Sequence, residues 1–333
     1  MAKLTARQRE AVLALVKTRV KLDNKLNQQV LRLFRANISQ IRQTLTHSGY
    51  LPSFFEFENA LRVVLSQHYR RVYRLFRTFT RDMLGLNIKA VTISSDPRKI
   101  KRLSIDGRIK ERLDRLFAGR SATQAARIRK TLLDELQRMY IYATQTTTLA
   151  DVSMSRHDLA VMITDTYRSR MASKANRIAI TETTYATELT KQTEAEELAN
   201  EFNADDFDVE DLDELDMDML EEAAEEGNED AEAILEEVED AVAAAGDGEG
   251  GIDEGLLDLA ASAAVVAAGI TITKTWVATL DDVTRETHAE ADGQEVSIDE
   301  PFSVGGDELM FPGDDGSPEE TINCRCTLVY GIS

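Results

Sequence analysis

The sequence predicts a mainly α protein, with a helical N-terminal body, an acidic spacer and a small α+β C-terminal domain. Apolar residues recur at three- and four-residue spacing through most of the chain up to residue 200, which is the period of a helix with one buried face. The chain contains five prolines and 6% aromatic residues. Because proline is excluded from helix interiors and aromatic residues are enriched in strands, this composition favours helices over an all-β sandwich.

Charge divides the chain into two parts. Residues 1–191 hold 36 basic and 16 acidic residues, a net charge of +20, whereas residues 192–333 hold 3 basic and 43 acidic residues, a net charge of −40. A basic segment can contact nucleic acid or an acidic protein, and an acidic segment repels nucleic acid. The longest uncharged apolar run, 259–273, is shorter than the ~20 residues of a membrane span, so we expect no stable span.

Six helices are expected before the acidic region. The first has a buried stripe of Leu22, Leu26, Val30, Phe34 and Ile38, and basic residues cover its other faces. The predicted helices span 3–46, 54–84, 105–118, 121–148, 156–171 and 174–200. We assign 1–173 to a basic helical body and 174–200 to a helix that packs with the C-terminal domain.

The remainder divides into a spacer and a compact domain. Residues 201–258 contain no lysine or arginine, and blocks of like charge are typical of a spacer or an insertion. Residues 259–333 predict an apolar helix, a strand over 270–280 and a short helix over 283–291, which Asp281 or Asp282 caps. Turns at glycine and proline follow, and a closing strand covers 324–330.

The C-terminal domain carries an ordered series of polar and aromatic residues between positions 274 and 326. The series consists of Lys274, Trp276, Arg285, His288, Asn323, Cys324, Arg325 and Cys326, and Arg177, Thr181 and Glu182 form a segment upstream of it. The series resembles the MuF-like family of phage minor head proteins, which carry a K-x-W strand, a helix with arginine and histidine three apart, and a terminal N-C-R-C. In the family, arginine commonly precedes the threonine of the upstream segment, where this chain has Ile180.

The resemblance implies a minor head (head morphogenesis) protein of a tailed bacteriophage. Members of the family associate with the portal or inner capsid, are packaged in the virion, and act in head assembly or genome delivery. We therefore expect portal or capsid protein as partner, and a location in the virion after assembly in the host cytoplasm. We expect no enzymatic activity, no catalytic residue and no small-molecule substrate. Two alternatives remain: an enzyme built on the C-terminal domain, and an acidic scaffold-like or DNA-mimic assembly factor.

Cys324 and Cys326 stand two positions apart, so on a strand both sulfurs project from one face. A disulfide between them would close a ring too short for ordinary geometry. His288 completes a candidate zinc site, with Asp314 or water as the fourth ligand. In the alternative interpretations the cysteines are small buried apolar residues, or one of them is a nucleophile with His288 as its base. The default expectation is no cofactor, with zinc as the alternative.

Two further ionisable residues lie on helix faces that are otherwise apolar. Glu182 shares a face with Ile178, Tyr185 and Leu189, and a buried carboxylate needs a cationic partner. We favour a structural ion pair with Arg285 or Arg325 over a catalytic carboxylate. His68 lies on the stripe of the second helix and is interpreted as a core histidine.

Clustered basic residues predict non-specific contact with packaged DNA. Arginines at three- and four-residue intervals on one helix can follow phosphates, and the sequence shows no helix-turn-helix, zinc-finger or nucleotide-binding motif. The alternative is a solvated face, or one that docks on an acidic protein. The candidate residues are Arg70, Arg71, Arg74, Arg77, Lys99, Lys101 and Arg102.

Overall fold

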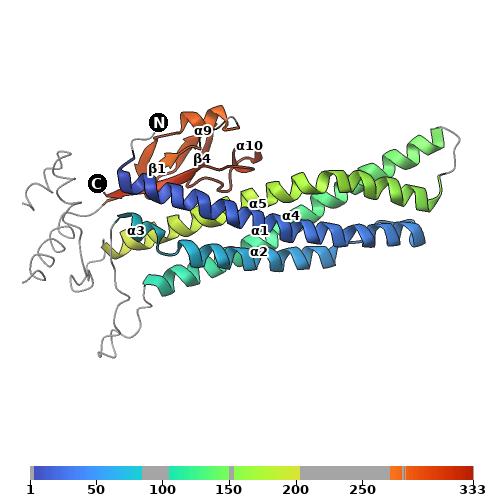
Figure 1. Ribbon diagram of the computed structural model, residues 1–333, viewed down its shortest axis with the longest axis horizontal. Helices are drawn as coiled ribbons and strands as arrows, with labels where there is room; N and C mark the ends of the chain where they lie inside the picture. The colour runs from blue at the N-terminus through green and yellow to red at the C-terminus, as the bar shows by residue number, and fades with distance from the viewer. Residues whose placement is uncertain are drawn as a thin grey trace, which may run out of the picture.

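The computed structural model describes residues 4–84, 105–149, 154–202, 271–279, 281 and 283–332. The fold is mainly α, as predicted. Four long helices lie side by side, and a small domain of short strands lies along one side of them (Figure 1). The long helices are α1 (Ala6–Ser48), α2 (Phe55–Phe76), α4 (Ile105–Leu149) and α5 (Arg156–Phe202), with a short α3 (Phe79–Leu84) after α2.

Helix α1 has well-defined ends. Thr5 caps its N-terminus: its hydroxyl accepts a hydrogen bond from the backbone N–H of Gln8, whose side chain accepts one from the Thr5 N–H. Gly49 ends the helix with φ of 76°, a left-handed conformation that glycine adopts without strain. The predicted stripe on this helix is buried, and it forms the core with apolar residues of α2, α4 and α5.

The helix boundaries differ from the prediction in three places. The predicted helices 105–118 and 121–148 are one helix, because a glycine inside a helix costs only ~1 kcal/mol and the buried Phe117 and Ala125 hold both sides of Gly119. The helices 156–171 and 174–200 are also continuous, since buried Met171 and Ala175 carry the stripe across the expected gap. The predicted helix 54–84, in contrast, is divided into α2 and α3.

The C-terminal domain contains two small antiparallel sheets. Strand β1 (Ile272–Val277) lies between β2 (Glu295–Ser297) and β5 (Thr327–Ile332), and β3 (Phe302–Val304) pairs with β4 (Asp307–Leu309). Two short helices, α9 (Glu286–Glu290) and α10 (Pro318–Thr321), complete the domain. Side chains of β1 alternate between buried and half-buried, as the predicted strand requires.

Two expectations for this domain are corrected. Helix α9 begins only at Glu286, because Asp281 closes a turn with Thr284 and Val283 ahead of it instead of capping the helix. The closing strand begins at Thr327, so Cys324 and Cys326 precede it in an extended segment. Asp282 lies outside the described residues.

The domain packs on the bundle over α1 and α5 (Figure 1). As a result, residues 182–195 of α5 are buried around the whole circumference of the helix. The spacer beyond residue 202 and the apolar run up to residue 270 lie outside the described residues, as do Lys99, Lys101 and Arg102. Among the described helices, none is both long and apolar enough to span a membrane.

Candidate functional site

The buried segment of α5 is polar, although it lies at the centre of the molecule. Its threonines, glutamates, glutamine and lysine face the other helices of the bundle and the C-terminal domain, and each ionised group has a partner of opposite charge. Buried charges are tolerated only when they are paired and hydrogen-bonded. This segment therefore defines how the bundle and the domain fit together.

Glu188 is the centre of the contact with β5. Its carboxylate lies 2.7 Å from Lys191 Nζ and 3.5 Å from Arg19 Nη1, and it accepts hydrogen bonds from the Thr327 hydroxyl and the Leu328 N–H. Lys191 in turn donates to Thr327 Oγ1 at 2.7 Å and to the Leu328 carbonyl at 2.9 Å. Burial lowers the pKa of Lys191 to about 8, and Glu188 opposes that shift.

Glu182 makes a different ion pair from the predicted one. Its carboxylate accepts a hydrogen bond from the Tyr69 hydroxyl at 2.6 Å and pairs with Arg120 at 3.3 Å, in place of Arg285 or Arg325. Arg120 also pairs with Asp315 of the C-terminal domain. The predicted connection between α5 and the C-terminal domain is thus made through Arg120 of α4. Sequence spacing did not indicate this residue as the partner.

Glu194 connects α5 to the start of α3. It accepts hydrogen bonds from the Thr80 N–H at 2.8 Å and from Arg81 Nε at 2.9 Å, and Arg81 also pairs with Asp106 of α4. Burial raises the pKa of Glu194 to about 7, against the opposing effects of Thr80 and Arg81.

Lys274, Trp276 and His288 of the motif series lie in the core of the C-terminal domain. The Lys274 ammonium is buried and donates to the Met310 carbonyl at 3.0 Å. Burial lowers its pKa to about 8. The Trp276 ring contacts the rings of His288 and Phe302 edge-on, at centroid separations of 5.7 and 5.4 Å.

The other motif residues hold the loop that precedes β5. Arg285 donates to the Ile322 carbonyl, and the Asn323 N–H donates to Thr181 Oγ1 at 3.1 Å. Asn323 itself has φ of 62°, a left-handed conformation that asparagine tolerates. Arg325 pairs with Asp281 at 2.8 Å. Arg177 is exposed instead, and lines a cleft of about 390 Å³ between α4, α5 and the 314–322 loop.

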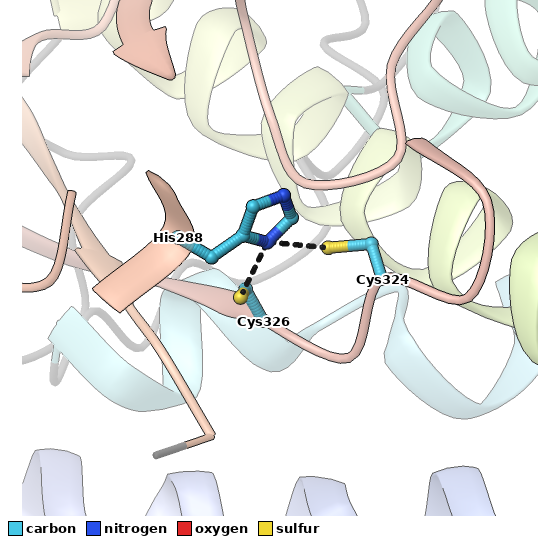
Figure 2. A group of neighbouring side chains, drawn as sticks. All are labelled: His288, Cys324 and Cys326. Atoms are coloured by element: carbon cyan, nitrogen blue, oxygen red, sulfur yellow. Dashed lines mark hydrogen bonds between the residues drawn. The ribbon is translucent and has the colours of Figure 1, made fainter. Parts of the chain in front are cut away.

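His288, Cys324 and Cys326 come together as the sequence predicts (Figure 2). His288 Nδ1 lies 3.2 Å from Cys326 Sγ and 3.7 Å from Cys324 Sγ, and all three residues are buried. The carbonyls of the two cysteines are held from the bundle: Thr184 donates to that of Cys324 at 2.7 Å, and Arg19 to that of Cys326 at 3.0 Å.

The electrostatic surroundings distinguish the two thiols. The pKa of Cys326 is lowered to about 5, first by a hydrogen bond from Cys324 and then, against the effect of burial, by His288. The hydrogen bond to Cys326 and burial raise the pKa of Cys324. His288 also has a carboxylate on its other side, since Glu320 Oε2 lies 3.0 Å from Nε2. Asp314, which with water was one of the two predicted fourth ligands, is not part of the cluster, and its carboxylate accepts hydrogen bonds from the N–H groups of Met310 and Asp315.

Sequence reasoning missed Arg19 and Glu320. Arg19 had a visible signal, because it interrupts the buried stripe between Leu15 and Leu22 at helical spacing. Glu320 had none, since its contact with His288 depends on how the 306–320 connection folds back.

The predicted basic residues of α2 do not all reach solvent. Arg70, Arg74 and Arg77 are exposed and lie on one side of the helix, whereas Arg71 is half-buried. His68 is buried, and its Nε2 lies 3.1 Å from the Thr183 hydroxyl. Burial lowers the pKa of His68 to about 3, which keeps it neutral.

Comparison with known proteins finds one family match and similarity to two named proteins. Residues 254–329 match the family described as Phage Mu protein F like protein. The chain is 38% identical over 73 residues to Minor head protein GP7 of Bacillus phage SPP1, covering 22% of this chain and 24% of that protein. It is 48% identical over 68 residues to an NAD(+)–arginine ADP-ribosyltransferase, EFV, of Enterococcus faecalis, covering 20% of this chain and 14% of that protein.

The chain thus spans less than a quarter of the length of either relative. No solved structure matches the chain. The family match includes β1, α9 and the first half of β5, and therefore contains the Trp276, His288 and cysteine residues whose assembly is described above. The C-terminal domain of this chain is therefore a MuF-like domain, and part of the chain is similar to the minor head protein of a bacteriophage.

Proposed function

We propose that the protein is a minor head protein of a tailed bacteriophage, packaged in the virion and bound to portal or inner capsid protein. The observation that carries the proposal is the MuF-like domain itself, shared with a protein named as a minor head protein. Its action is in head assembly or genome delivery, and it passes through the host cytoplasm during assembly.

The buried contacts between the C-terminal domain and the helical bundle support a structural role. The domain is fastened to the bundle through Glu188, Lys191 and Arg19, all of which are buried. A buried, fully paired network favours one fixed arrangement, which suits a component that positions a domain within an assembly.

The exposed arginines of α2 support contact with packaged DNA. Arg70, Arg74 and Arg77 present their charges along one side of the helix, at a spacing that can follow a phosphate backbone. Such contacts carry no sequence information, so the binding is non-specific.

We further propose that the protein is not an enzyme. Cys326 and His288 could form a thiolate–imidazole pair, but both are nearly inaccessible, with exposed fractions of 3% and 2%. A nucleophile must meet its substrate. The similarity to the ADP-ribosyltransferase covers 14% of that protein, too little to carry its activity to this chain.

Mass spectrometry of purified virions tests the proposal. The protein should be present in mature, DNA-filled heads at a constant ratio to portal protein, and its deletion should lower the yield of infectious particles. Presence in empty precursor heads alone would instead support the scaffold-like or DNA-mimic alternative. Normal infectivity without the protein would contradict the proposed role in assembly or delivery.

A further inference from the structure

We propose that His288, Cys324 and Cys326 are ligands of a structural Zn²⁺ ion, which fastens α9 to the segment before β5. This inference goes beyond the proposed function and does not depend on it. The three residues come from two separate parts of the domain, so a shared ion would connect them directly (Figure 2).

The donor atoms have the separations that zinc requires. His288 Nδ1 lies 3.2 and 3.7 Å from the two sulfurs, and the three donor atoms lie within 4.8 Å of one another. Tetrahedral zinc, with bonds of roughly 2.0–2.1 Å to nitrogen and 2.3 Å to sulfur, places the two kinds of ligand about 3.6 Å apart. Shifts of a few tenths of an ångström would therefore bring His288 Nδ1 and each sulfur to the separation that a shared ion requires.

The chemistry of the donors selects the metal. Two thiolates and one imidazole suit zinc, whereas magnesium and calcium require oxygen ligands. Each of the three donors is nearly excluded from solvent, with exposed fractions of 2%, 1% and 3% for His288, Cys324 and Cys326. Three protein ligands with an open fourth position are typical of catalytic zinc, but burial keeps substrates away from these residues and therefore favours a structural ion.

The second ring nitrogen of a zinc-bound histidine commonly contacts a carboxylate, and His288 has one at that position. Glu320 Oε2 lies 3.0 Å from His288 Nε2, the ring nitrogen that faces away from the sulfurs. The Thr287 hydroxyl donates to the same Oε2 at 2.8 Å and orients it. Nε2 makes no well-aligned hydrogen bond in the structure. A carboxylate this close nevertheless favours the tautomer with its proton on Nε2, which leaves the Nδ1 lone pair for the metal.

The backbone around the site holds these groups in place. Thr184 and Arg19 bind the carbonyls of Cys324 and Cys326, so the cysteine segment is anchored from the bundle side, opposite to His288. Gly305 makes room for Glu320, since a Cβ at position 305 would lie 2.3 Å from Glu320 Oε1. Ligands and outer-shell groups are thus fixed by contacts outside the cluster.

Metal analysis of the full-length protein, purified under reducing conditions without chelators, tests the site. We expect about one zinc per chain, and replacement by Co²⁺ should produce thiolate-to-cobalt charge-transfer absorption, which requires sulfur ligands. Cys324→Ser should reduce that absorption by at least half, because one of the two thiolates is lost. Substoichiometric zinc together with no cobalt–sulfur band in the wild-type protein would overturn the proposal, as would an unchanged band in the serine variant.

A second pair of variants tests the site without replacing a zinc ligand, because a ligand substitution could itself disturb folding. Glu320→Gln should weaken zinc binding by roughly 10–100-fold in a chelator competition titration, because the outer-shell carboxylate is lost. Glu319→Gln removes the same charge from the adjacent, exposed residue and should leave the affinity unchanged. Equal affinities for the two variants would show that Glu320 does not support a metal-bound His288.

Discussion

Replacing Glu188 with alanine tests whether the buried ion pairs hold the domain on the bundle. The substitution leaves Lys191, which is fully buried, without its carboxylate, and removes the acceptor of the Leu328 N–H. Breaking a buried pair on one side costs about 3–5 kcal/mol of unfolding free energy, because the remaining charge stays buried and uncompensated. That is a large part of the ~5–15 kcal/mol that a folded domain has in total.

The assay uses two signals in one urea titration. Trp276 is the single tryptophan of the chain and lies in the C-terminal domain, so its fluorescence reports on that domain. Far-UV circular dichroism reports on the helices. In the Glu188→Ala variant both midpoints should fall, and the tryptophan transition should come first if the domain detaches before the bundle unfolds.

Two controls separate burial from charge. Asp114→Ala breaks the Lys110–Asp114 pair, whose side chains are 63% and 46% exposed, and should change stability by less than ~0.5 kcal/mol. Combining Glu188→Leu with Lys191→Met removes both charges of the closer pair and should recover part of the loss, because Arg19, which also pairs with Glu188, remains buried. A Glu188→Ala cost as small as that of the Asp114 control would refute the reasoning, and so would a double variant less stable than Glu188→Ala.

Three further predictions concern pH, backbone conformation and DNA. The pKa of Glu194 is raised from 4.5 to about 7 in the folded protein, so the folded state binds more protons than the unfolded state across this range. Stability should therefore fall as the pH rises from 4.5 to 7. Glu194→Gln should flatten this decrease, which denaturation curves at several pH values measure. Gly305→Ala should cost on the order of 1–3 kcal/mol, because φ there is +61° and the added Cβ displaces Glu320; thermal denaturation measures it. In filter binding to duplex DNA, alanine at three exposed positions should lower the slope of log K against log salt by up to about 3, at ~0.9 per phosphate contact. The three positions are Arg70, Arg74 and Arg77.

Each of these has a result that would contradict it. An unchanged pH profile in Glu194→Gln would mean that other groups cause the decrease. For the glycine, Gly119→Ala is the control, since that residue is helical with open space around it and should be neutral or stabilising; an equal effect at both sites would exclude strain at position 305. For DNA, alanine at Lys17, Lys21 and Lys25, exposed on α1, removes the same charge, and an equal loss of slope would mean that α2 is not a preferred contact.

The architecture was predictable where burial follows helical or strand periodicity. The apolar stripe of α1 and the alternation of side chains along β1 each predict which face is buried, and the structure confirms both. Helix junctions were less predictable, because small residues such as Gly119 permit a break without requiring one, and packing on both sides decides.

The polar interior could not be anticipated in the same way. The polarity of residues 182–195 of α5 alone would suggest a solvent-exposed face, and only the coverage by four helices and the C-terminal domain makes them a core. The convergence of His288 with the two cysteines followed from the motif order, but the partner of Glu182 did not, since Arg120 lies on a helix that sequence spacing cannot orient.

The continuity of α5 has a mechanical consequence. A single helix of 47 residues extends for roughly 70 Å at 1.5 Å per residue. One part of this helix forms the far end of the bundle, and another part carries the Glu188–Lys191 ion pair that contacts the C-terminal domain. Such a rod resists bending, so a displacement imposed at one end arrives at the other as a shift or rotation of the whole domain. The distance between the C-terminal domain and the far end of the bundle is therefore fixed by the length of α5.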